Sequence, residues 1–483
     1  MAKIIFVQEI WFPLGAVMAL SASLKKAGHD VQVAVGDENK VIKEVLAYHP
    51  DIIAFSIITP FRKFMLTVSK KLRKIGVNKL IIVGGYDASF FPQIVETAPI
   101  EVLCVGEGED AFVELANAFD KGKDFSKIKN LWVKKSGKII KNGIRPFKPL
   151  NERLFYDRDV YRNYDSFFRD IEFEQMMVGG GCPYKCSYCF NHKYRELYSP
   201  VDKNYCGLRK VDLVIEECLI LKNKYKVKNI FFNDSTLGFN KVWLREFLTR
   251  YKREVNLPFT INVTVNEITE EFCQLLAATK KCFIIRIGLE TGNEKFRAAV
   301  LNKPIPNSQY IKATNLFKKY NLSYSMATML GLPGETLAYA LETLDFAEKI
   351  SSRKSTVAIN IFKPFPKLDI TEYGVKIGLY DKALIDDDNL IGDNVMTFYD
   401  SFRTDREGRQ ILNLSRLSYI YLHFSFLRTL IKRKLINLPD NKLYRFIYKY
   451  TEAFYTTRRH VNASLGYLLK YLFKHRGKQI RGN

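Results

Sequence analysis

Residues 179–190 read GGGCPYKCSYCF and follow directly on a strand-like segment at 172–178. The three cysteines, Cys182, Cys186 and Cys189, are separated by three and two residues on a loop that begins with glycines. Thiolates at this spacing can converge on one iron–sulfur cubane, each on a different iron, and three ligands leave one iron open. An open iron can chelate the amine and carboxylate of S-adenosylmethionine (SAM). The loop therefore predicts a 4Fe–4S cluster held by these thiolates.

A zinc site is the alternative for this cluster. His192 follows Cys189 at a spacing of three, so the cysteines together with this histidine also suit a tetrahedral zinc knuckle. The chain would then be a zinc-knuckle protein that recruits RNA through its basic residues. Zinc knuckles are small autonomous units, whereas this cluster opens a series of alternating strands and helices. That context favours the iron–sulfur interpretation.

The residues after the cysteine loop alternate between strand-like and helical segments. Six such units over about 190 residues are too few for the usual eight-fold barrel and favour a partial, open (β/α)6 barrel. The strand candidates lie at 172–178, 230–233, 259–264, 283–289, 322–329 and 357–361.

Residues 1–125 alternate short apolar strands with amphipathic helices, which predicts a doubly wound, Rossmann-like α/β domain with a parallel sheet. In such sheets, ligands bind outside the carboxyl ends of the strands, and glycines let the backbone approach them closely. No G-x-G-x-x-G pattern occurs, so a nicotinamide dinucleotide is not supported. The loops that follow successive strands contain Leu14 and Gly15, Ser56, Gly84 and Gly85, and Gly106 and Glu107.

The chain has 483 residues, which is too long for one ordinary core, and its 47% hydrophobic content excludes a disordered chain. We expect the Rossmann-like domain at 1–125, a connector at 126–170, the partial barrel at 171–368 and a helical C-terminal domain at 369–483. No apolar run reaches the roughly 18 residues of a membrane span, and the N-terminus lacks a signal-peptide pattern. A cytoplasmic location is expected, with reduced cysteines.

Basic residues outnumber acidic ones by 75 to 51, a formal net charge of +24. Residues 401–483 carry 18 Lys and Arg against four Asp and Glu, with many aromatic residues among them. This pattern is typical of a peripheral contact with an anionic membrane. It is also typical of a helical lid that packs its aromatics on the barrel while its charges face water. No recognition motif supports a nucleic-acid partner.

The spacing of the three cysteines, with aromatic Tyr188 before the last, resembles the signature of the radical SAM superfamily. The resemblance implies that the cluster reduces SAM to methionine and a 5′-deoxyadenosyl radical, with Tyr188 beside the adenine. Asp234 ends a segment, FFND, that resembles a SAM-contacting strand end. Glu290 lies in IGLETG, which resembles the segment whose carboxylate holds the ribose hydroxyls. The structural alternative for Glu290 is a carboxylate favoured near a helix N-terminus.

The first domain is similar to the cobalamin-binding domain that precedes many radical SAM domains. Where relatives often have Gly-Gly-Pro-His, this chain has Gly84-Gly85-Tyr86-Asp87, so a histidine contact cannot be carried over. None of the six histidines lies in an Asp-x-His-x-x-Gly pattern, so cobalamin would lack a histidine ligand from that motif. The resemblance places around cobalamin the residues Leu14, Gly15, Ser56, Gly84, Gly85, Gly106 and Glu107.

Together the resemblances imply a cobalamin-dependent radical SAM enzyme. The expected reaction is methylation of an unactivated carbon or phosphorus centre of an unknown small-molecule or lipid substrate. Methylcobalamin would supply the methyl group, and an external electron donor such as a flavodoxin or ferredoxin would reduce the cluster. The alternative is a radical SAM cyclase, or an oxidative or coupling enzyme, that acts on a lipid or another substrate. A transfer-RNA methylthiotransferase is not expected, because that class binds a second cluster through N-terminal cysteines and only Cys104 lies in the first domain.

Overall fold

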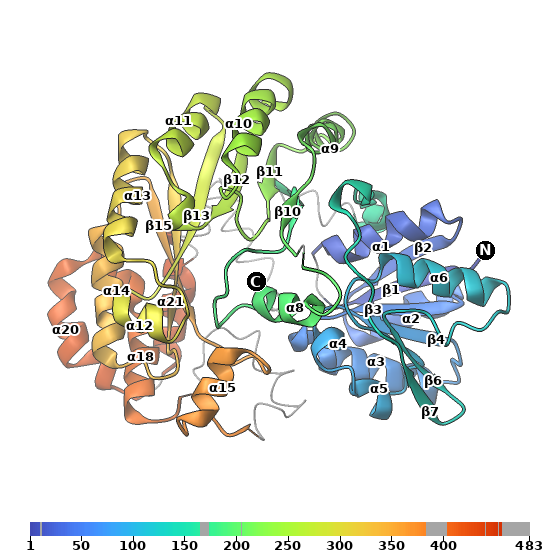
Figure 1. Cartoon of the computed structure of the whole chain (residues 1–483). Coiled ribbons are helices and arrows are strands. Elements are labelled where there is room, and N and C mark those ends of the chain that lie inside the picture. The colour runs from blue at the N-terminus through green and yellow to red at the C-terminus, as the bar shows by residue number, and fades with distance from the viewer. Residues whose placement is uncertain are drawn as a thin grey trace.

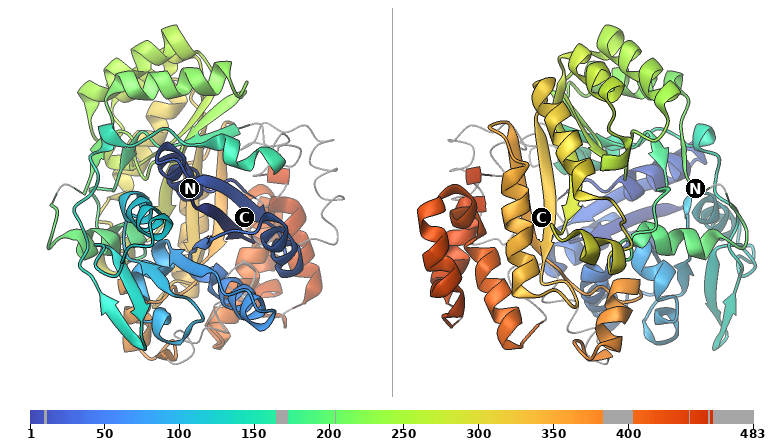
Figure 2. Two further views of the ribbon diagram at one scale, coloured as in Figure 1. Left: turned by 90° about the vertical axis from the view of Figure 1, so that its right-hand side faces the viewer. Right: turned by 60° about the vertical axis from the view of Figure 1, so that its left-hand side comes forward.

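The computed structural model describes residues 1–9, 12–164, 173–203, 205–382, 403–439, 441–452 and 454–455. Two α/β units lie beside each other, and C-terminal helices pack on the side of the second unit that faces away from the first (Figures 1 and 2). Parts of three predicted segments lie outside the described residues: the connector at 165–170, the strand start at 172, and the C-terminal domain at 383–402 and 456–483.

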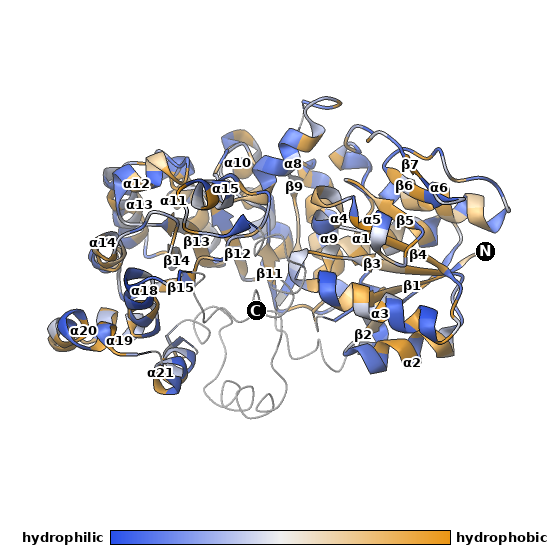
Figure 3. Ribbon diagram, turned by 90° about the horizontal axis from the view of Figure 1, so that it is seen from below, coloured by the Kyte–Doolittle hydropathy of each residue, from blue (hydrophilic) through white to orange (hydrophobic). Residues whose placement is uncertain are grey.

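The first unit is a seven-stranded sheet in the order β2-β1-β3-β4-β5-β6-β7. Its strands are hydrophobic, and its two faces are covered by different helices (Figure 3). The parallel strands are β1 (Lys3–Gln8), β2 (Asp30–Val35), β3 (Ile52–Ser56), β4 (Leu80–Gly84) and β5 (Val102–Cys104). One face packs on α1 (Gly15–Lys26) and α6 (Glu109–Asp120), the other on α2 (Glu38–Tyr48) and α3 (Arg62–Lys74). The remaining helices of this unit are α4 (Tyr86–Phe90) and α5 (Ile94–Thr97).

An antiparallel hairpin extends this sheet beyond residue 125. β6 (Leu131–Lys135) pairs with β5, and β7 (Lys138–Lys141) pairs with β6. The turn residues Ser136 and Gly137 both have positive φ, 49° and 77°, which is the geometry of a tight hairpin turn. Part of the sequence predicted as a connector therefore belongs to the first sheet.

The second unit is a six-stranded, entirely parallel sheet in the order β15-β14-β13-β12-β11-β8. The order leaves β8 and β15 as unpaired edges, so the barrel is open, and the predicted fold class is confirmed. The strands are β8 (Phe173–Met176), β11 (Asn229–Phe232), β12 (Phe259–Val263), β13 (Cys282–Glu290), β14 (Tyr324–Leu330) and β15 (Ser355–Ile361). The intervening helices are α9 (Val211–Asn223), α10 (Lys241–Arg250), α11 (Glu270–Thr279), α12 (Glu294–Ala299), α13 (Asn307–Lys319) and α14 (Leu337–Lys349).

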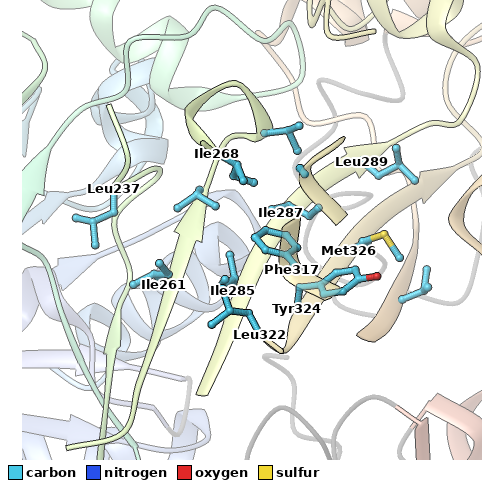
Figure 4. Close-up of a cluster of buried hydrophobic side chains, with 14 of the residues drawn as sticks. Leu237, Ile261, Ile268, Ile285, Ile287, Leu289, Phe317, Leu322, Tyr324 and Met326 are labelled. Atoms are coloured by element: carbon cyan, nitrogen blue, oxygen red, sulfur yellow. The ribbon is translucent and has the colours of Figure 1, made fainter. Parts of the chain in front are cut away.

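The main hydrophobic core lies between the barrel strands and their helices. On β13, Ile285, Ile287 and Leu289 point into this core, where they meet Phe317 of α13 (Figure 4). Alternate residues of a strand point to opposite faces of the sheet. The residues between these apolar ones therefore face the inside of the open barrel.

The C-terminal helices pack along the β15 side of the barrel. Tyr448 donates a hydrogen bond to the carbonyl of Ile359 in β15, and Tyr421 donates one to Asp345 of α14. No helix within the described ranges has the length and hydropathy of a membrane-crossing segment. The helices on this side are α18 (Arg406–Arg416), α19 (Ser418–His423), α20 (Arg428–Arg433) and α21 (Lys442–Glu452). α15 (Asp369–Lys376) lies apart from them (Figure 1), and the amide of Ile370 donates a 3.2 Å hydrogen bond to the carbonyl of Ser187 in the cluster loop.

Candidate active site

Backbone packing holds the predicted cluster loop in place. β9 (Gly179–Gly180) pairs antiparallel with β10 (Gly207–Leu208), and α8 (Phe190–Tyr198) begins where the loop ends. Gly181 has a φ of 71°, and a Cβ there would lie 1.9 Å from the carbonyl oxygen of Tyr205. No side chain fits at that distance, so the close approach of the two segments requires this glycine.

The three predicted cluster ligands lie close together. Cys182, Cys186 and Cys189 are partly exposed, and none forms a disulfide. Burial, and then repulsion from Cys189 and Cys186, raises the pKa of the Cys182 thiol to about 12. The amide of Cys189 donates a 3.1 Å hydrogen bond to the carbonyl of Cys186, so a tight turn brings these two cysteines together. Bound iron would relieve the repulsion because it is held by thiolates. This donor set fits a cluster with three protein ligands.

The geometry around His192 does not support the zinc knuckle. Its Nε2 lies 3.1 Å from Glu196 and 3.3 Å from Asp369, both carboxylate oxygens. Among the described residues, no three His, Cys, Asp or Glu side chains are arranged to hold a single metal ion. A tetrahedral zinc site needs four ligands around one ion, so this arrangement lacks the required geometry.

Asp234 supports the strand that leads into the cluster loop. Its Oδ2 accepts a 2.9 Å hydrogen bond from the amide of Val178, and its Oδ1 accepts one of 2.8 Å from Gly179. Burial raises the pKa of Asp234 to about 6, although the two amides oppose this shift. Both carboxylate oxygens therefore have backbone partners, and a contact between Asp234 and SAM stays a prediction.

A second buried carboxylate, Glu267, was not predicted from the sequence. It accepts hydrogen bonds from the hydroxyl of Tyr184 in the cluster loop, at 3.1 Å, and from the amide of Gly238, at 2.8 Å. It also bonds to the hydroxyl of Thr236. Glu267 thus ties the cluster loop to the carboxyl ends of β11 and β12. The only feature of the sequence that could have pointed to Glu267 is its position just after a strand.

Two of the residues predicted to bind SAM meet at the end of β13. The Tyr188 hydroxyl donates a 2.9 Å hydrogen bond to Oε1 of Glu290. Nζ of Lys303 lies 3.1 Å from the same oxygen and donates a 2.6 Å bond to the carbonyl of Gly288. The N-cap of α12 is Asn293 and not Glu290, so the helix-terminus alternative for Glu290 is not supported. No motif in the sequence pointed to Lys303.

A cavity of about 990 Å³ lies between the two α/β units. All seven residues predicted to surround cobalamin line it: Leu14, Gly15, Ser56, Gly84, Gly85, Gly106 and Glu107. The barrel contributes, among others, Gly179–Gly180, Gly181, Tyr205 and Cys206. The cavity therefore reaches the glycine half of the cluster loop, whereas the three cluster cysteines, Tyr188 and Glu290 are not among its lining residues.

The size and backbone of this cavity fit a large planar ligand such as cobalamin. Its volume is at the upper end of the roughly 300–1,000 Å³ of ligand pockets. Gly85 has a φ of 102°, and a Cβ there would lie 2.3 Å from the carbonyl oxygen of Ile57. A Cβ on Gly106 would lie 2.3 Å from the Tyr198 hydroxyl. The loops after β4 and β5 therefore pack closely on Ile57 and Tyr198, which requires glycine at both positions, and both glycines line the cavity.

Asp87, which stands where the sequence resemblance would place a histidine, forms an ion pair. Asp87 is buried and accepts bonds of 2.9 and 2.7 Å from Nε and Nη2 of Arg62. The pair joins the loop after β3 to the loop after β4. No histidine occurs among the residues that line the described cavity. The sequence-based expectation that cobalamin lacks a histidine ligand here is consistent with this lining.

Glu107 forms part of the connection between the cavity and the connector. It pairs with Arg153, and its backbone amide donates a 2.7 Å hydrogen bond to the hydroxyl of Tyr198 in α8. Burial raises the pKa of Glu107 to about 7, while Arg153 lowers it. Glu107 therefore links the end of β5 to both the connector and the helix that follows the cluster loop.

Known proteins share both parts of this architecture. Residues 4–116 match the B12 binding domain, and residues 176–347 match the Radical SAM superfamily. An uncharacterized methyltransferase of Pyrococcus horikoshii is 28% identical over 380 residues, which are 75% of this chain and 78% of that protein. An anaerobic magnesium-protoporphyrin IX monomethyl ester cyclase of Rubrivivax gelatinosus is 22% identical over 77% of this chain and 68% of its own length.

Two solved structures have the same fold. The radical SAM methyltransferase TsrM of Kitasatospora setae aligns with a TM-score of 0.62 and 17% identity, over 78% of this chain and 76% of its own. The cobalamin-dependent SAM radical enzyme OxsB aligns with a TM-score of 0.62 and 17% identity, over 99% of this chain and 73% of its own.

A three-cysteine loop on an open barrel, facing a glycine-lined cavity of a B12-binding domain, defines a radical SAM enzyme that carries cobalamin. The chain belongs to the cobalamin-dependent radical SAM enzymes. Its cofactors are a 4Fe–4S cluster, SAM and cobalamin, as expected from the sequence, and the zinc-knuckle hypothesis is wrong.

Proposed function

We propose that this enzyme is a methyltransferase that acts on an unactivated carbon or phosphorus centre. The observation that carries the proposal is the cavity between the two units, because its walls combine the cobalamin-side glycine loops with the leading glycines of the cluster loop. A substrate in this cavity would lie beside the glycine half of the cluster loop and against the loops that we propose hold cobalamin. The 28% identical relative from Pyrococcus horikoshii is named a methyltransferase, which supports the same reaction.

Residues of both units would hold the cofactors. Cys182, Cys186 and Cys189 would hold the cluster, and Tyr188 and Glu290 would orient SAM. When bound, the cluster and SAM supply hydrogen-abstraction chemistry, and cobalamin supplies a methyl group. In the first unit, the loops at the ends of β3, β4 and β5, which line the cavity, would support the corrin ring.

Aromatic side chains close the contact between the units beside the cluster loop. Tyr86 of α4 packs edge-on against Tyr194 of α8, with ring centroids 5.1 Å apart, and Phe90 stacks on Phe190 at 5.4 Å. Tyr86 and Tyr194 also line the cavity. This wall would exclude water from a reactive intermediate, which prevents side reactions.

Neutral polar groups on the barrel side of the cavity are suited to orienting a substrate. Nδ2 of Asn191 donates a 2.8 Å hydrogen bond to the hydroxyl of Ser235, and the hydroxyl of Tyr205 donates one of 3.0 Å to Oδ1 of Asn191. Such groups fix orientation in an otherwise largely apolar pocket.

The test uses anaerobically reconstituted enzyme, a reductant and SAM that carries a deuterated methyl group. Small-molecule and lipid extracts of the source cells serve as substrate mixtures, and mass spectrometry follows the products. We expect 5′-deoxyadenosine together with a product that has gained one deuterated methyl group. Formation of 5′-deoxyadenosine with a product that has lost hydrogen and gained no methyl would contradict methyl transfer.

A radical cyclase, or an oxidative or coupling enzyme, is the second candidate function. It is favoured by the 22% identical relative, which is named a cyclase and which also aligns over more than three quarters of this chain. The same experiment distinguishes the two candidates, because ring formation or oxidation changes the hydrogen count without adding carbon.

The proposed partners follow from the cofactors and from the C-terminal surface. An external electron donor such as a flavodoxin or ferredoxin would reduce the cluster, since radical SAM cleavage consumes an electron. On α21, Tyr444 and Tyr448 are buried, and the opposite stripe of Leu443, Phe446 and Tyr450 is exposed. Phe454, which lies beyond the end of α21, is exposed as well. The exposed basic residues Lys442, Arg445 and Lys449 lie on α21. Apolar and basic side chains together would give a peripheral contact with an anionic membrane.

A further inference from the structure

Arg286 is a charged residue in a central strand of the barrel sheet. Its neighbours on β13, Ile285 and Ile287, point outward into the helix-covered core (Figure 4). Arg286 must therefore face the opposite side, the inside of the open barrel. In the strand register it is paired with Asn262 of β12 and with Ser325 of β14. It thus lies in the middle of a polar row.

The inner face of the sheet carries little charge. Within the described strands, only Arg286 and Glu290 of the inward-facing residues are ionisable. Glu290 has its counter-charge, because Lys303 pairs with it. In the part of the chain that the structure describes, Arg286 has neither an ion pair nor a hydrogen bond from its side chain, and its one recorded side-chain contact is the face of Phe231, 5.1 Å from the ring centroid.

The side chain of Arg286 is accessible. It is exposed, and its inward-facing place in the strand register puts it on the concave face of the sheet. The surrounding residues lower the pKa of its guanidinium. The guanidinium nevertheless stays protonated at neutral pH, so its charge is available to a ligand that enters the open barrel.

We propose that Arg286 binds an oxyanion, a carboxylate or a phosphate, of the molecule on which the enzyme acts. The planar guanidinium presents its N–H groups as a fork that matches either anion. The contact with the ring of Phe231 would fix the plane of the guanidinium. The claim that the anion belongs to the substrate rests on the proposed function. The claim that Arg286 binds an anion does not.

The test is chemical labelling of the intact, reconstituted enzyme with phenylglyoxal, followed by peptide mapping. Labelling of Arg286 is compared in sodium phosphate, sodium acetate and sodium chloride at equal ionic strength. Arg353 is the matched reference, because it is an exposed arginine in the loop before β15. We expect phosphate or acetate to slow labelling of Arg286 about threefold at an anion concentration near twice the dissociation constant, and to leave Arg353 unchanged.

The anion that slows the labelling of Arg286 by phenylglyoxal identifies the chemical class of the bound group. Protection by phosphate alone assigns a phosphate site, and protection by acetate a carboxylate site. Absence of labelling at Arg286, or equal rates in all three salts, overturns the proposal. Because labelling requires no turnover, the result is independent of whether methyl transfer is the reaction.

Discussion

The hydroxyl of Tyr188 donates a 2.9 Å hydrogen bond to Oε1 of Glu290, although 102 positions separate the two residues in the chain. The bond joins the loop that carries the cluster cysteines to the end of β13. Lys303 approaches the same carboxylate oxygen at 3.1 Å. The Glu290 carboxylate is therefore already held in place by the cluster loop and by Lys303 in the absence of SAM.

Replacement of Glu290 by Gln is expected to weaken SAM binding. A hydrogen bond to a charged group contributes about 1.5–3 kcal/mol, so its loss predicts roughly a 10- to 100-fold higher dissociation constant. Equilibrium binding of SAM to the reconstituted enzyme measures the effect. Glu246→Gln, at an exposed position on α10, is the control. Unchanged affinity in Glu290→Gln would show that another group holds the ribose.

Serine replacements of Cys182, Cys186 and Cys189 are each expected to abolish the cluster. Iron should fall from about four atoms per chain to a small fraction of that value, because three thiolates are needed to hold the cubane. Cys206 is the neighbouring control, since its thiol lines the adjacent cavity and acts electrostatically on Cys182. Iron analysis of reconstituted proteins is the measurement. If Cys206→Ser loses iron equally, the assignment of three ligands is incomplete.

Replacement of Gly106 by Ala is expected to reduce cobalamin retention. The new Cβ would lie 2.3 Å from the Tyr198 hydroxyl, so the loop after β5 must shift, at a cost of about 1–3 kcal/mol. Gly76→Ala is a matched control, because its φ of 83° equals that of Gly106, 84°, within a degree and nothing lies within 4 Å of its Cβ. Bound cobalamin after gel filtration is compared. Equal retention by both variants would place cobalamin away from this loop.

Glu335 gives a pH-dependent contribution to stability. Burial raises its pKa to about 8, although the amides of Gly331 and Leu332 lower it, and its Oε1 has no hydrogen-bond partner among the described residues. An unfolded glutamate titrates near about 4.3. Between these values the folded state binds more protons than the unfolded state, so a rising pH destabilises the fold until both states are ionised.

The Glu335→Gln variant removes this titration. Its apparent melting temperature relative to wild type should therefore increase as the pH rises from about 4.5 to about 8, and then remain constant. Thermal unfolding across this range, with Glu246→Gln as the exposed control, provides the measurement. A difference that does not change with pH would mean that Glu335 is ionised in the folded protein throughout.

The exposed stripe of α21 predicts binding to anionic vesicles. Vesicles that contain phosphatidylglycerol should bind the full chain, and vesicles of phosphatidylcholine alone should not, because the basic residues need anionic partners. Phe446→Ser combined with Phe454→Ser should weaken binding about tenfold or more, since partial burial of two aromatic rings is lost. Phe446 is 57% exposed.

The matched control for this surface is Val242→Ser. Val242 is 74% exposed on α10, on another part of the barrel, so its loss should leave vesicle binding unchanged. Vesicle flotation is the measurement, and high salt should lower binding because it screens surface charge. Equal binding to neutral vesicles, or no effect of the double replacement, would favour a purely structural role for these helices.

Local sequence patterns identified the parts of this protein that depend on short spacing. Cys182, Cys186 and Cys189 lie within eight residues, so their convergence follows from one loop. The glycine loops could be located because each follows an apolar strand, and parallel strands bring their carboxyl ends to one edge. The two sheets and the cluster loop could thus be predicted without coordinates, whereas cobalamin followed from the resemblance of the first domain to a known family.

Other features depend on contacts between distant segments. Lys303 reaches Glu290 from beyond α12, and Glu267 reaches Tyr184 from the end of β12. Neither contact follows a periodic pattern. The hairpin of β6 and β7 was predicted as part of a connector, because its sequence shows two strands and a turn but not the sheet edge on which they pair.

The sequence alone determined the two α/β units and the cluster loop, because each depends on residue type at short spacing, and the resemblance of its motifs to known families implied the cofactors. The tertiary structure decided which faces meet. It placed all seven predicted cobalamin-side residues around one cavity, directed Asp234 toward the backbone amides of Val178 and Gly179, and left Arg286 without a counter-charge inside the barrel. Such relationships depend on strand register and domain contact, which sequence spacing does not encode.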